Sequence, residues 1–260
     1  MDFQHARRIV VKVGTSTLAY PNGRLHLRRV EKLVKVLADL KNSGREILLV
    51  TSAAIGVGAG LLGLKERPRD TGGKQAAAAV GQCELMYTYD KLFSEYGHRT
   101  AQLLLTRDVV DDSRRRQNVV NTLNRLMELG VLPIINENDT VAVEELEFGD
   151  NDTLSAIVAV LAEAEGLVLL TDIDGLYTDD PRRNPDARRI PVVEEITPEL
   201  LEAAKGAGSA LGTGGMTTKL HAAAIATGQG IPTVVMQGAD PEALYDLTEG
   251  KPVGTLFKGR

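Results

Sequence analysis

The chain has 260 residues, of which 43% are hydrophobic and only 4% aromatic, with no tryptophan. This length suits one large domain or two small ones, and it is enough to bury a substantial core. Aliphatic cores of this kind are typical of sheets packed between helices, so an α/β fold is favoured over a β-sandwich.

The net charge of −5 does not indicate the basic surface that nucleic-acid-binding proteins use. Cys83 is the sole cysteine, which excludes an internal disulfide, and the four histidines have no metal-ligand spacing. No apolar run reaches the ~18 residues of a membrane span, and no signal segment follows the charged N-terminus. We therefore expect a cytoplasmic protein that binds neither nucleic acid nor membranes.

Short β-branched runs recur along the chain, and each is followed by a segment of helical length. Because most of these runs are continuously apolar, helices are expected to cover both faces of the sheet. The predicted fold is a three-layer α/β/α sandwich with a mainly parallel central sheet. Its expected strands are 9–13, 47–51, 100–105, 131–135, 167–171 and 233–236.

Between these strands, apolar residues recur at helical spacing over 27–41, 154–164 and 217–228. Weak alternation over 140–148 predicts a hairpin or an edge strand, and the polar stretch 178–189 predicts a surface loop. No certain domain boundary is found, so a single domain is expected over 1–260.

Two glycine-linked lysine loops, Val11 to Ser16 and Gly212 to Lys219, lie near opposite ends of the chain. Lysine beside flexible backbone can bring an ammonium and amide N–H groups to one phosphate. Lys12 ends an apolar strand, so it either faces a cleft or extends to the surface. A lysine at the position of Lys219 opposes the helix dipole, which indicates a nearby anion. The alternative is that Lys219 is an ordinary first-turn residue, after a turn in which Thr217 is the N-cap. The loops predict a phosphate clamp.

Two polar clusters, Asn136 to Asp139 and Gly149 to Thr153, contain more acid and amide groups than one turn or helix cap requires. The surplus would suit a ligand ammonium, a metal, or the orientation of lysines. Ser52 follows another strand, where it either caps the next helix or binds a ligand. It lacks the elbow motif of a nucleophile. Ligands bind at the carboxyl ends of parallel strands, so one crevice could collect all these residues.

Common nucleotide-binding motifs are missing from the sequence: no stretch matches the Walker P-loop or the protein-kinase pattern. Gly58, Gly60 and Gly63 match GxGxxG, but they lie within an expected helix. Since that motif requires a strand immediately before it, dinucleotide binding is not supported.

The motifs resemble those of the amino acid kinase family, and within it the members that phosphorylate the γ-carboxylate of L-glutamate in the first step of proline biosynthesis. The resemblance extends over nearly the whole chain, from the Lys12 loop to Gly254-Thr255-Leu256-Phe257. It is most specific in Asn136 to Asp139, Gly149 to Asp152 and Thr213 to Lys219.

That resemblance implies ATP and Mg²⁺ as cofactors, with the metal bound through the ATP phosphates and not directly by the protein. Lys12 and Lys219 would be catalytic by neutralising the transferring group, and Asp152 would hold them. Glutamate would be bound by Ser52, Asp139, Asn151 and Asp150, the last at its α-ammonium. Phosphoryl oxygens would be received by Gly14 and by amides near Ser52 and Ala53. ATP would be bound by Lys12, Gly14, Thr171, Asp172, Thr213, Gly214, Gly215, Met216, Thr217, Thr218 and Lys219.

The resemblance further implies that residues 1–165 form the glutamate-binding part and 166–260 the nucleotide-binding part. It implies a homodimer or homotetramer, proline as feedback inhibitor, and glutamyl phosphate reductase as a partner. Two departures stand out. Ala53 replaces the glycine common in the family, and its methyl group is expected to narrow the approach of substrate. The PUA domain that many members append at the C-terminus is not expected here.

Two classes of alternative remain open. The first is another kinase of the same fold, acting on aspartate, acetylglutamate, carbamate or uridylate. Asp139 and Asp150 favour a substrate with a free ammonium, which argues against the last three. The second is a non-catalytic nucleotide or amino-acid sensor. The presence of Lys12, Lys219 and Asp152 favours an enzyme, because a sensor would not need them.

Overall fold

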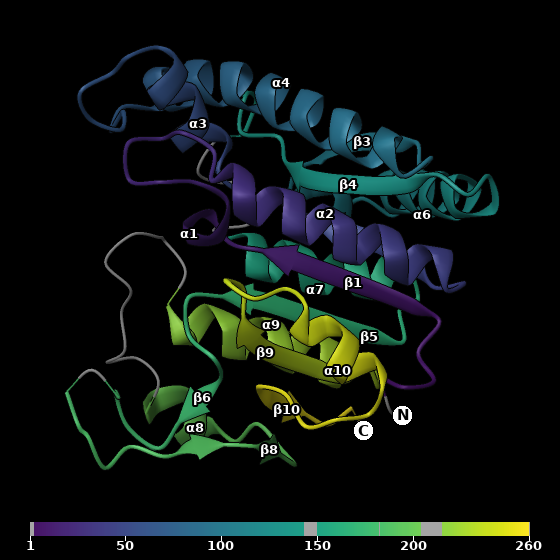
Figure 1. Ribbon diagram of the computed structural model, residues 1–260, viewed down its shortest axis with the longest axis vertical. Coiled ribbons are helices and arrows are strands. Elements are labelled where there is room, and N and C mark those ends of the chain that lie inside the picture. Colours follow the sequence, from purple (N-terminus) through teal and green to yellow (C-terminus); the bar gives the residue numbers. More distant parts are fainter. Residues whose placement is uncertain (1–2, 143–149, 182, 204–214, 260) are drawn as a thin grey trace.

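The computed structural model describes residues 3–142, 150–181, 183–203 and 215–259 (Figure 1). Its main sheet has eight strands in the order β3-β4-β2-β1-β5-β9-β10-β8. These are β1 (Arg8–Val13), β2 (Glu46–Val50), β3 (Thr100–Leu105), β4 (Leu132–Glu137), β5 (Gly166–Thr171), β8 (Val192–Val193), β9 (Thr233–Gln237) and β10 (Thr255–Phe257). A separate antiparallel pair is formed by β6 (Leu176–Tyr177) and β7 (Arg189–Ile190).

The main sheet is parallel at every described pairing except that of β9 with β10. Side chains alternate along each strand, and β1 shows the consequence. Ile9, Val11 and Val13 pack into one apolar core, whereas Val10 packs into the other. The predicted mainly parallel sheet covered on both faces is therefore confirmed.

Each face has its own set of helices (Figure 1). The first core contains side chains from α1 (Thr15–Leu18), α2 (Leu27–Asn42), α3 (Ala54–Leu61), α4 (Thr71–Glu95) and α10 (Ala243–Thr248). The second contains side chains from α5 (Asp108–Asp111), α6 (Ser113–Glu128), α7 (Asn151–Leu161), α8 (Pro198–Ala203) and α9 (Met216–Thr227). Across the described residues, none of these helices combines the length and apolar character needed to cross a membrane.

The predicted elements agree with the structure to within two residues, with two exceptions. The helix expected from residue 154 begins at Asn151, because Asp150 accepts a hydrogen bond from the Thr153 amide and caps it. The surface loop expected over 178–189 ends in β7, which pairs with β6. The hairpin or edge strand expected over 140–148 falls mostly on residues 143–149, which lie outside the described residues.

The GxGxxG glycines form a helix-packing contact. A Cβ atom on Gly58 would lie 1.8 Å from the carbonyl oxygen of Ala77, and one on Gly81 would lie 1.9 Å from that of Ala54. Only glycine permits α3 and α4 to approach this closely. A Cβ atom on Gly60 would similarly lie 2.9 Å from the backbone carbonyl carbon of Gly23. These contacts account for Gly58 and Gly60 and fix α3 and α4 beside the carboxyl end of β2.

Candidate active site

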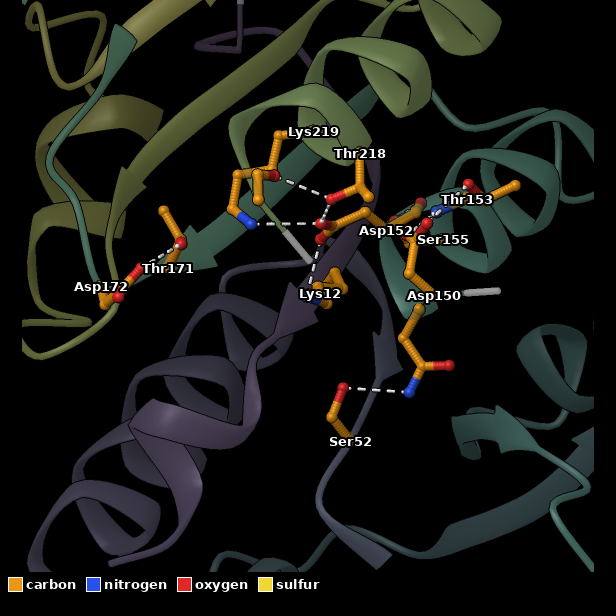
Figure 2. A network of polar contacts seen from close by, with 12 residues as sticks. Lys12, Ser52, Asp150, Asp152, Thr153, Ser155, Thr171, Asp172, Thr218 and Lys219 are labelled. Carbon is orange, nitrogen blue, oxygen red and sulfur yellow. Dashed lines mark hydrogen bonds and ion pairs between the residues drawn. The ribbon is translucent and has the colours of Figure 1, made fainter. Parts of the chain in front are cut away.

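A buried ion-paired cluster lies where the carboxyl end of β1 meets the starts of α7 and α9 (Figure 2). Lys12 Nζ is 2.6 Å from Asp152 Oδ1, and Lys219 Nζ is 3.2 Å from Asp152 Oδ2. Thr218 Oγ1 donates a hydrogen bond to Asp152 Oδ2 at 2.9 Å. The two lysines, predicted from opposite ends of the chain to converge, therefore share one carboxylate.

The strand pattern explains how Lys12 reaches this position. It shares the face of Val10, so it points toward the layer that contains α7 and α9. Asp152 and Lys219 lie in the first turns of those two helices. Lys12 is only 7% exposed, Asp152 1% and Lys219 5%, so none of them is an ordinary surface residue. The expectation that Lys12 faces a cleft, rather than extending to the surface, is confirmed.

The electrostatics of the cluster keep Asp152 ionised. Burial alone would raise the pKa of this carboxyl group, but Lys12, Lys219 and their hydrogen-bonding neighbours outweigh it and hold the pKa at about 2. One carboxylate therefore faces two ammonium groups at neutral pH. Two ammonium groups held at one cavity wall are suited to contact an anionic ligand.

Amide side chains join the strands next to β1. Asn151 Nδ2 lies 2.7 Å from the Thr51 carbonyl oxygen, 3.0 Å from Ser52 Oγ and 2.9 Å from Asn136 Oδ1. Asn136 Nδ2 in turn donates to Gln82 Oε1 of α4 at 2.8 Å. This chain of buried hydrogen bonds fixes Asn151 and Ser52 relative to α4.

Ser52 does not cap the helix that follows it. The N-cap of α3 is Ala53, which has a left-handed backbone with φ of +82° and no side-chain cap. The Ser52 hydroxyl instead contacts Asn151 and remains at the cavity wall. The capping alternative for Ser52 is therefore wrong, while its place beside Asn151 is consistent with ligand binding.

A cavity of about 630 Å³ joins these groups. Lys12, Lys219 and Asp152 line it together with Ser52 and Asn151. Asp139 and Asp150 add carboxylates, and Thr171 and Asp172 enter from the end of β5. Because the strands that carry these residues neighbour β1 on both sides, the crevice spans the centre of the sheet. A cavity of this size can hold a small ligand.

Residues 7–237 match the amino acid kinase family. The chain belongs to the amino acid kinase family. It is 53% identical over 256 residues to the glutamate 5-kinase of Clostridium perfringens, with 97% of this chain and 95% of that protein covered. It is 54% identical over 251 residues to the glutamate 5-kinase of Clostridium tetani, with 96% and 94% covered. Among solved structures, the UMP kinase from Bacillus anthracis is similar with a TM-score of 0.67 at 15% identity, covering 98% of this chain and 96% of that one. At this identity the likeness shows the fold alone.

The residues predicted to bind ATP are only partly described. Thr213 and Gly214 lie outside the described residues, and Gly215 is the N-cap of α9. Met216 and Thr217 begin that helix, and neither they nor Thr218 are among the described residues that line the cavity. Thr218 contacts it indirectly through Asp152. Thr217 is not the N-cap that the alternative interpretation of this loop required.

Gly14, which was predicted to receive phosphoryl oxygens, directly follows β1. Its N–H group donates to the carbonyl oxygen of Leu170 at 3.3 Å, which extends the pairing of β1 with β5. The Gly14 N–H group is thus engaged with β5 in this conformation, and a role of Gly14 in receiving phosphoryl oxygens stays a prediction. Gly14 nevertheless lines the cavity beside Lys12, and a Cβ atom there would lie 3.7 Å from Lys12 Nζ.

Asp150 is consistent with both alternatives for its cluster, helix capping and ligand binding. It caps α7 through the Thr153 amide at 2.8 Å, and it also lines the cavity. Burial raises its pKa, and the nearby Asp152 adds to this effect, while Thr153 and Lys12 oppose it. A carboxylate with a raised pKa gains from a cationic ligand group, because the ligand would stabilise its charged form.

A group of cations that was not predicted from the sequence lines the cavity wall. Arg67 and Arg69 lie between α3 and α4, and Lys74 lies in the first turn of α4. The signal for Lys74 was present but unused. Thr71-Gly72-Gly73-Lys74 places a lysine after a Thr-Gly-Gly sequence, as Thr213-Gly214-Gly215 precedes Lys219.

Proposed function

We propose that this chain acts as a glutamate 5-kinase, which transfers the γ-phosphoryl group of ATP to the γ-carboxylate of L-glutamate. The products are L-glutamyl 5-phosphate and ADP, and the reaction would begin proline biosynthesis. The observation that carries the proposal is the convergence of Lys12 and Lys219 on Asp152 at the wall of one cavity. The two relatives more than 50% identical along nearly the whole chain support glutamate as the acceptor.

The nucleophile needs no general base. A γ-carboxylate with a solution pKa near ~4.3 is ionised at neutral pH. One of its oxygens would attack the γ-phosphorus as the bond to the β,γ-bridging oxygen breaks, and that electron pair leaves on ADP. The chain then has to offset the repulsion between an anionic nucleophile and a triphosphate and to align the reacting oxygens.

The buried cluster suits that task. Lys12 and Lys219 would contact the phosphoryl group that is transferred, and Asp152 would hold both ammonium groups in place before ATP arrives. Charges held in advance in a site without water need little reorganisation during the reaction, which makes them effective. Asp152 also limits the cost of burying two cations in the absence of ligand.

Magnesium fits this site as a companion of ATP. The described residues contain no group of three or more His, Cys, Asp or Glu side chains placed to hold a metal ion. In the proposed reaction the ion would be carried by the ATP phosphates. When bound, magnesium would add positive charge to the triphosphate. Thr171 and Asp172, at the end of β5, would lie on the nucleotide side.

The polar wall at Ser52 favours an amino acid over other acceptors. Ser52 and Asn151 would hold the acceptor carboxylate, and Asp139 and Asp150 would bind an α-ammonium group. A substrate such as acetylglutamate, carbamate or uridylate lacks that ammonium and would leave the two carboxylates unpaired. Aspartate keeps the ammonium but is one methylene shorter, so it would not reach the γ-phosphorus from the same anchors.

Further properties follow as part of the same proposal. Residues 1–165 would bind glutamate and residues 166–260 the nucleotide, with the cavity between them. Proline would compete for the glutamate wall, since it shares the α-ammonium and α-carboxylate of the substrate. We also propose a cytoplasmic homodimer or homotetramer that passes its labile product to glutamyl phosphate reductase.

The test is an assay of ATP consumption in the presence of hydroxylamine, which converts an acyl phosphate into a stable hydroxamate. We expect ADP and hydroxamate in equal amounts with L-glutamate, and little product with L-aspartate or N-acetyl-L-glutamate. ATP consumption without glutamate-dependent hydroxamate would contradict the proposed reaction. Binding of ATP and glutamate without turnover would favour the sensor.

A further inference from the structure

A basic wall of three residues, Arg67, Arg69 and Lys74, lines the cavity from one side. Among the residues that the structure describes, the other cations that line it are Lys12 and Lys219, and these are paired with Asp152. None of the three has a role in the phosphoryl-transfer steps described above. Their charge therefore requires a separate explanation.

The basic wall lies on the acceptor side of the cavity. In the sheet, β2 and β4 flank β1 on the side opposite to β5 and β9. The segment between α3 and α4 belongs to the β2 side, whereas α9 lies with β9 and carries Lys219 (Figure 1). A cation on the β2 side is therefore better placed for the acceptor than for the nucleotide.

A hydrogen bond ties the start of α4 to the turn that carries Asp139. Gln75 Nε2, next to Lys74 in the chain, donates to the carbonyl oxygen of Ala142 at 3.3 Å. Asn138 accepts backbone hydrogen bonds from Val141 and Ala142, which closes the turn around Asp139. The cation of Lys74 and the carboxylate of Asp139 thus approach the same cavity from two tethered segments.

Lys74 is the best anchored of the three cations. It lies in a helix of 25 residues, and the close contact of Gly58 and Gly81 holds that helix against α3. A lysine in the first turn opposes the helix dipole, so an anion beside it would be stabilising. Arg69 lies instead in the connecting segment, 3.6 Å from Glu66 on the surface.

We propose that Lys74 binds the α-carboxylate of the amino-acid acceptor, with Arg67 and Arg69 adding positive potential to the same wall. The inference rests on the proposed glutamate 5-kinase activity and extends it. The α-ammonium would face Asp139 and Asp150, and the γ-carboxylate would face Lys12 and Lys219. Positive and negative groups at separate positions along the cavity would fix the direction in which the amino acid binds, which gives specificity.

The test pairs a change in the protein with a change in the substrate. Lys74→Met removes the charge and keeps a long side chain suited to a helix. Lys91→Met is the matched control, because Lys91 is an exposed lysine of the same helix that is not among the residues lining the cavity. The second acceptor is 4-aminobutanoate, which retains the amine and the reacting carboxylate of glutamate but lacks the α-carboxylate.

We expect Lys74→Met to lower kcat/KM for glutamate by about 10- to 100-fold, as for loss of one charged hydrogen bond. The KM for ATP should stay within about twofold, and Lys74→Arg should recover much of the loss. The inhibition constant of 4-aminobutanoate against glutamate should stay within about twofold of wild type, because the missing contact is to a group that this ligand lacks. Inhibition yields that constant even where turnover of 4-aminobutanoate is slow.

Three results would overturn the proposal. Equal losses for glutamate and 4-aminobutanoate would mean that Lys74 acts on the fold or on catalysis in general. A rise in the KM for ATP with that for glutamate unchanged would place Lys74 on the phosphates. If the kinetic constants of Lys74→Met equalled those of Lys91→Met, Lys74 would have no role in binding the acceptor. Absence of hydroxamate in the wild type would instead reject the proposed function itself.

Discussion

The cavity has two cationic regions that differ in how their charges are held. Lys12 and Lys219 are buried and share the carboxylate of Asp152, so their positions are set by the protein before any ligand binds. Arg67, Arg69 and Lys74 are exposed on a helix start and its preceding segment. The difference teaches that the buried cluster should govern stability and turnover together, whereas the basic wall should govern substrate binding with little effect on the fold.

The largest effect is expected when the carboxylate of Asp152 is removed. Asp152→Asn removes the carboxylate that pairs with both buried lysines, and loss of one partner in a buried ion pair typically costs about 3 to 5 kcal/mol. Urea unfolding at neutral pH should show a loss of this size. Asp240→Asn, which removes a surface ion pair with Lys32, should change stability by less than about 1 kcal/mol. Equal effects would contradict the distinction between buried and exposed charges.

The same carboxyl group predicts a pH dependence. The pKa of Asp152 is lowered from 3.8 to about 2 in the folded chain, so its ionisation stabilises the fold above the unfolded value. That contribution is lost as pH falls through the folded value. In wild type, unfolding free energy should therefore decrease between pH 4 and pH 2, and Asp152→Asn should show a shallower decrease. A slope that is unchanged in the variant would mean that Asp152 does not titrate as proposed.

Single lysine variants test the contribution of the cluster to turnover while one ion pair with Asp152 is kept. In Lys12→Ala or Lys219→Ala the remaining lysine still pairs with Asp152, so the fold should persist. Removal of one such electrostatic group commonly costs ~10² to 10³ in rate, or about 3 to 4 kcal/mol. Hydroxamate formation measures this loss, and Lys251→Ala, a surface change, serves as the control. Near-normal turnover in either variant would refute the role assigned to that lysine.

A smaller effect is expected from the amide chain behind Asn151. Gln82→Leu removes the acceptor for Asn136 Nδ2, and an unsatisfied buried donor costs about 1 to 3 kcal/mol. Because Asn136 also accepts from Asn151, we expect the KM for glutamate to rise about tenfold with a much smaller change in kcat. Gln117→Leu removes an exposed hydrogen bond on α6 and should leave both constants unchanged. A fall in kcat alone would contradict a positioning role for Gln82.

The smallest predicted effect concerns Ala53. Its φ of +82° is left-handed, which costs a residue with a Cβ atom roughly 1 kcal/mol relative to glycine. Ala53→Gly should therefore increase stability by up to about 1 kcal/mol in urea unfolding. Ala54→Gly, at the first residue of α3, should instead decrease it, since that residue is helical. A loss of stability in Ala53→Gly would contradict the strain argument.

Much of this arrangement could be predicted from the sequence, because parallel strands have a strong signature. Continuous apolar runs predicted the positions of the strands. The polar residues at the strand ends were then candidate site residues: Lys12, Ser52, Thr171 and Asp172. The convergence of Lys12 and Lys219 was predicted because charges at a buried strand end and in a helix start both call for a partner. The structure confirms that convergence, while the assigned roles remain predictions.

Other features depend on contacts between distant segments and were beyond pattern analysis. Ser52 was a candidate cap by its residue type, but the left-handed backbone at Ala53 moves the helix start past it. The same backbone gives a physical reason for glycine at this position in the family, in addition to the space taken by the Ala53 methyl group. The glycines of α3 matched a nucleotide motif, although Gly58 serves packing against α4.

The most direct test of the central claim follows an oxygen atom. Glutamate labelled with ¹⁸O in the γ-carboxylate is turned over with ATP and trapped with hydroxylamine, which attacks the acyl carbon and releases phosphate. If the carboxylate attacks phosphorus between the two lysines, each released phosphate carries one labelled oxygen from glutamate. Unlabelled phosphate would mean that water or another group was the acceptor, and the account would be wrong.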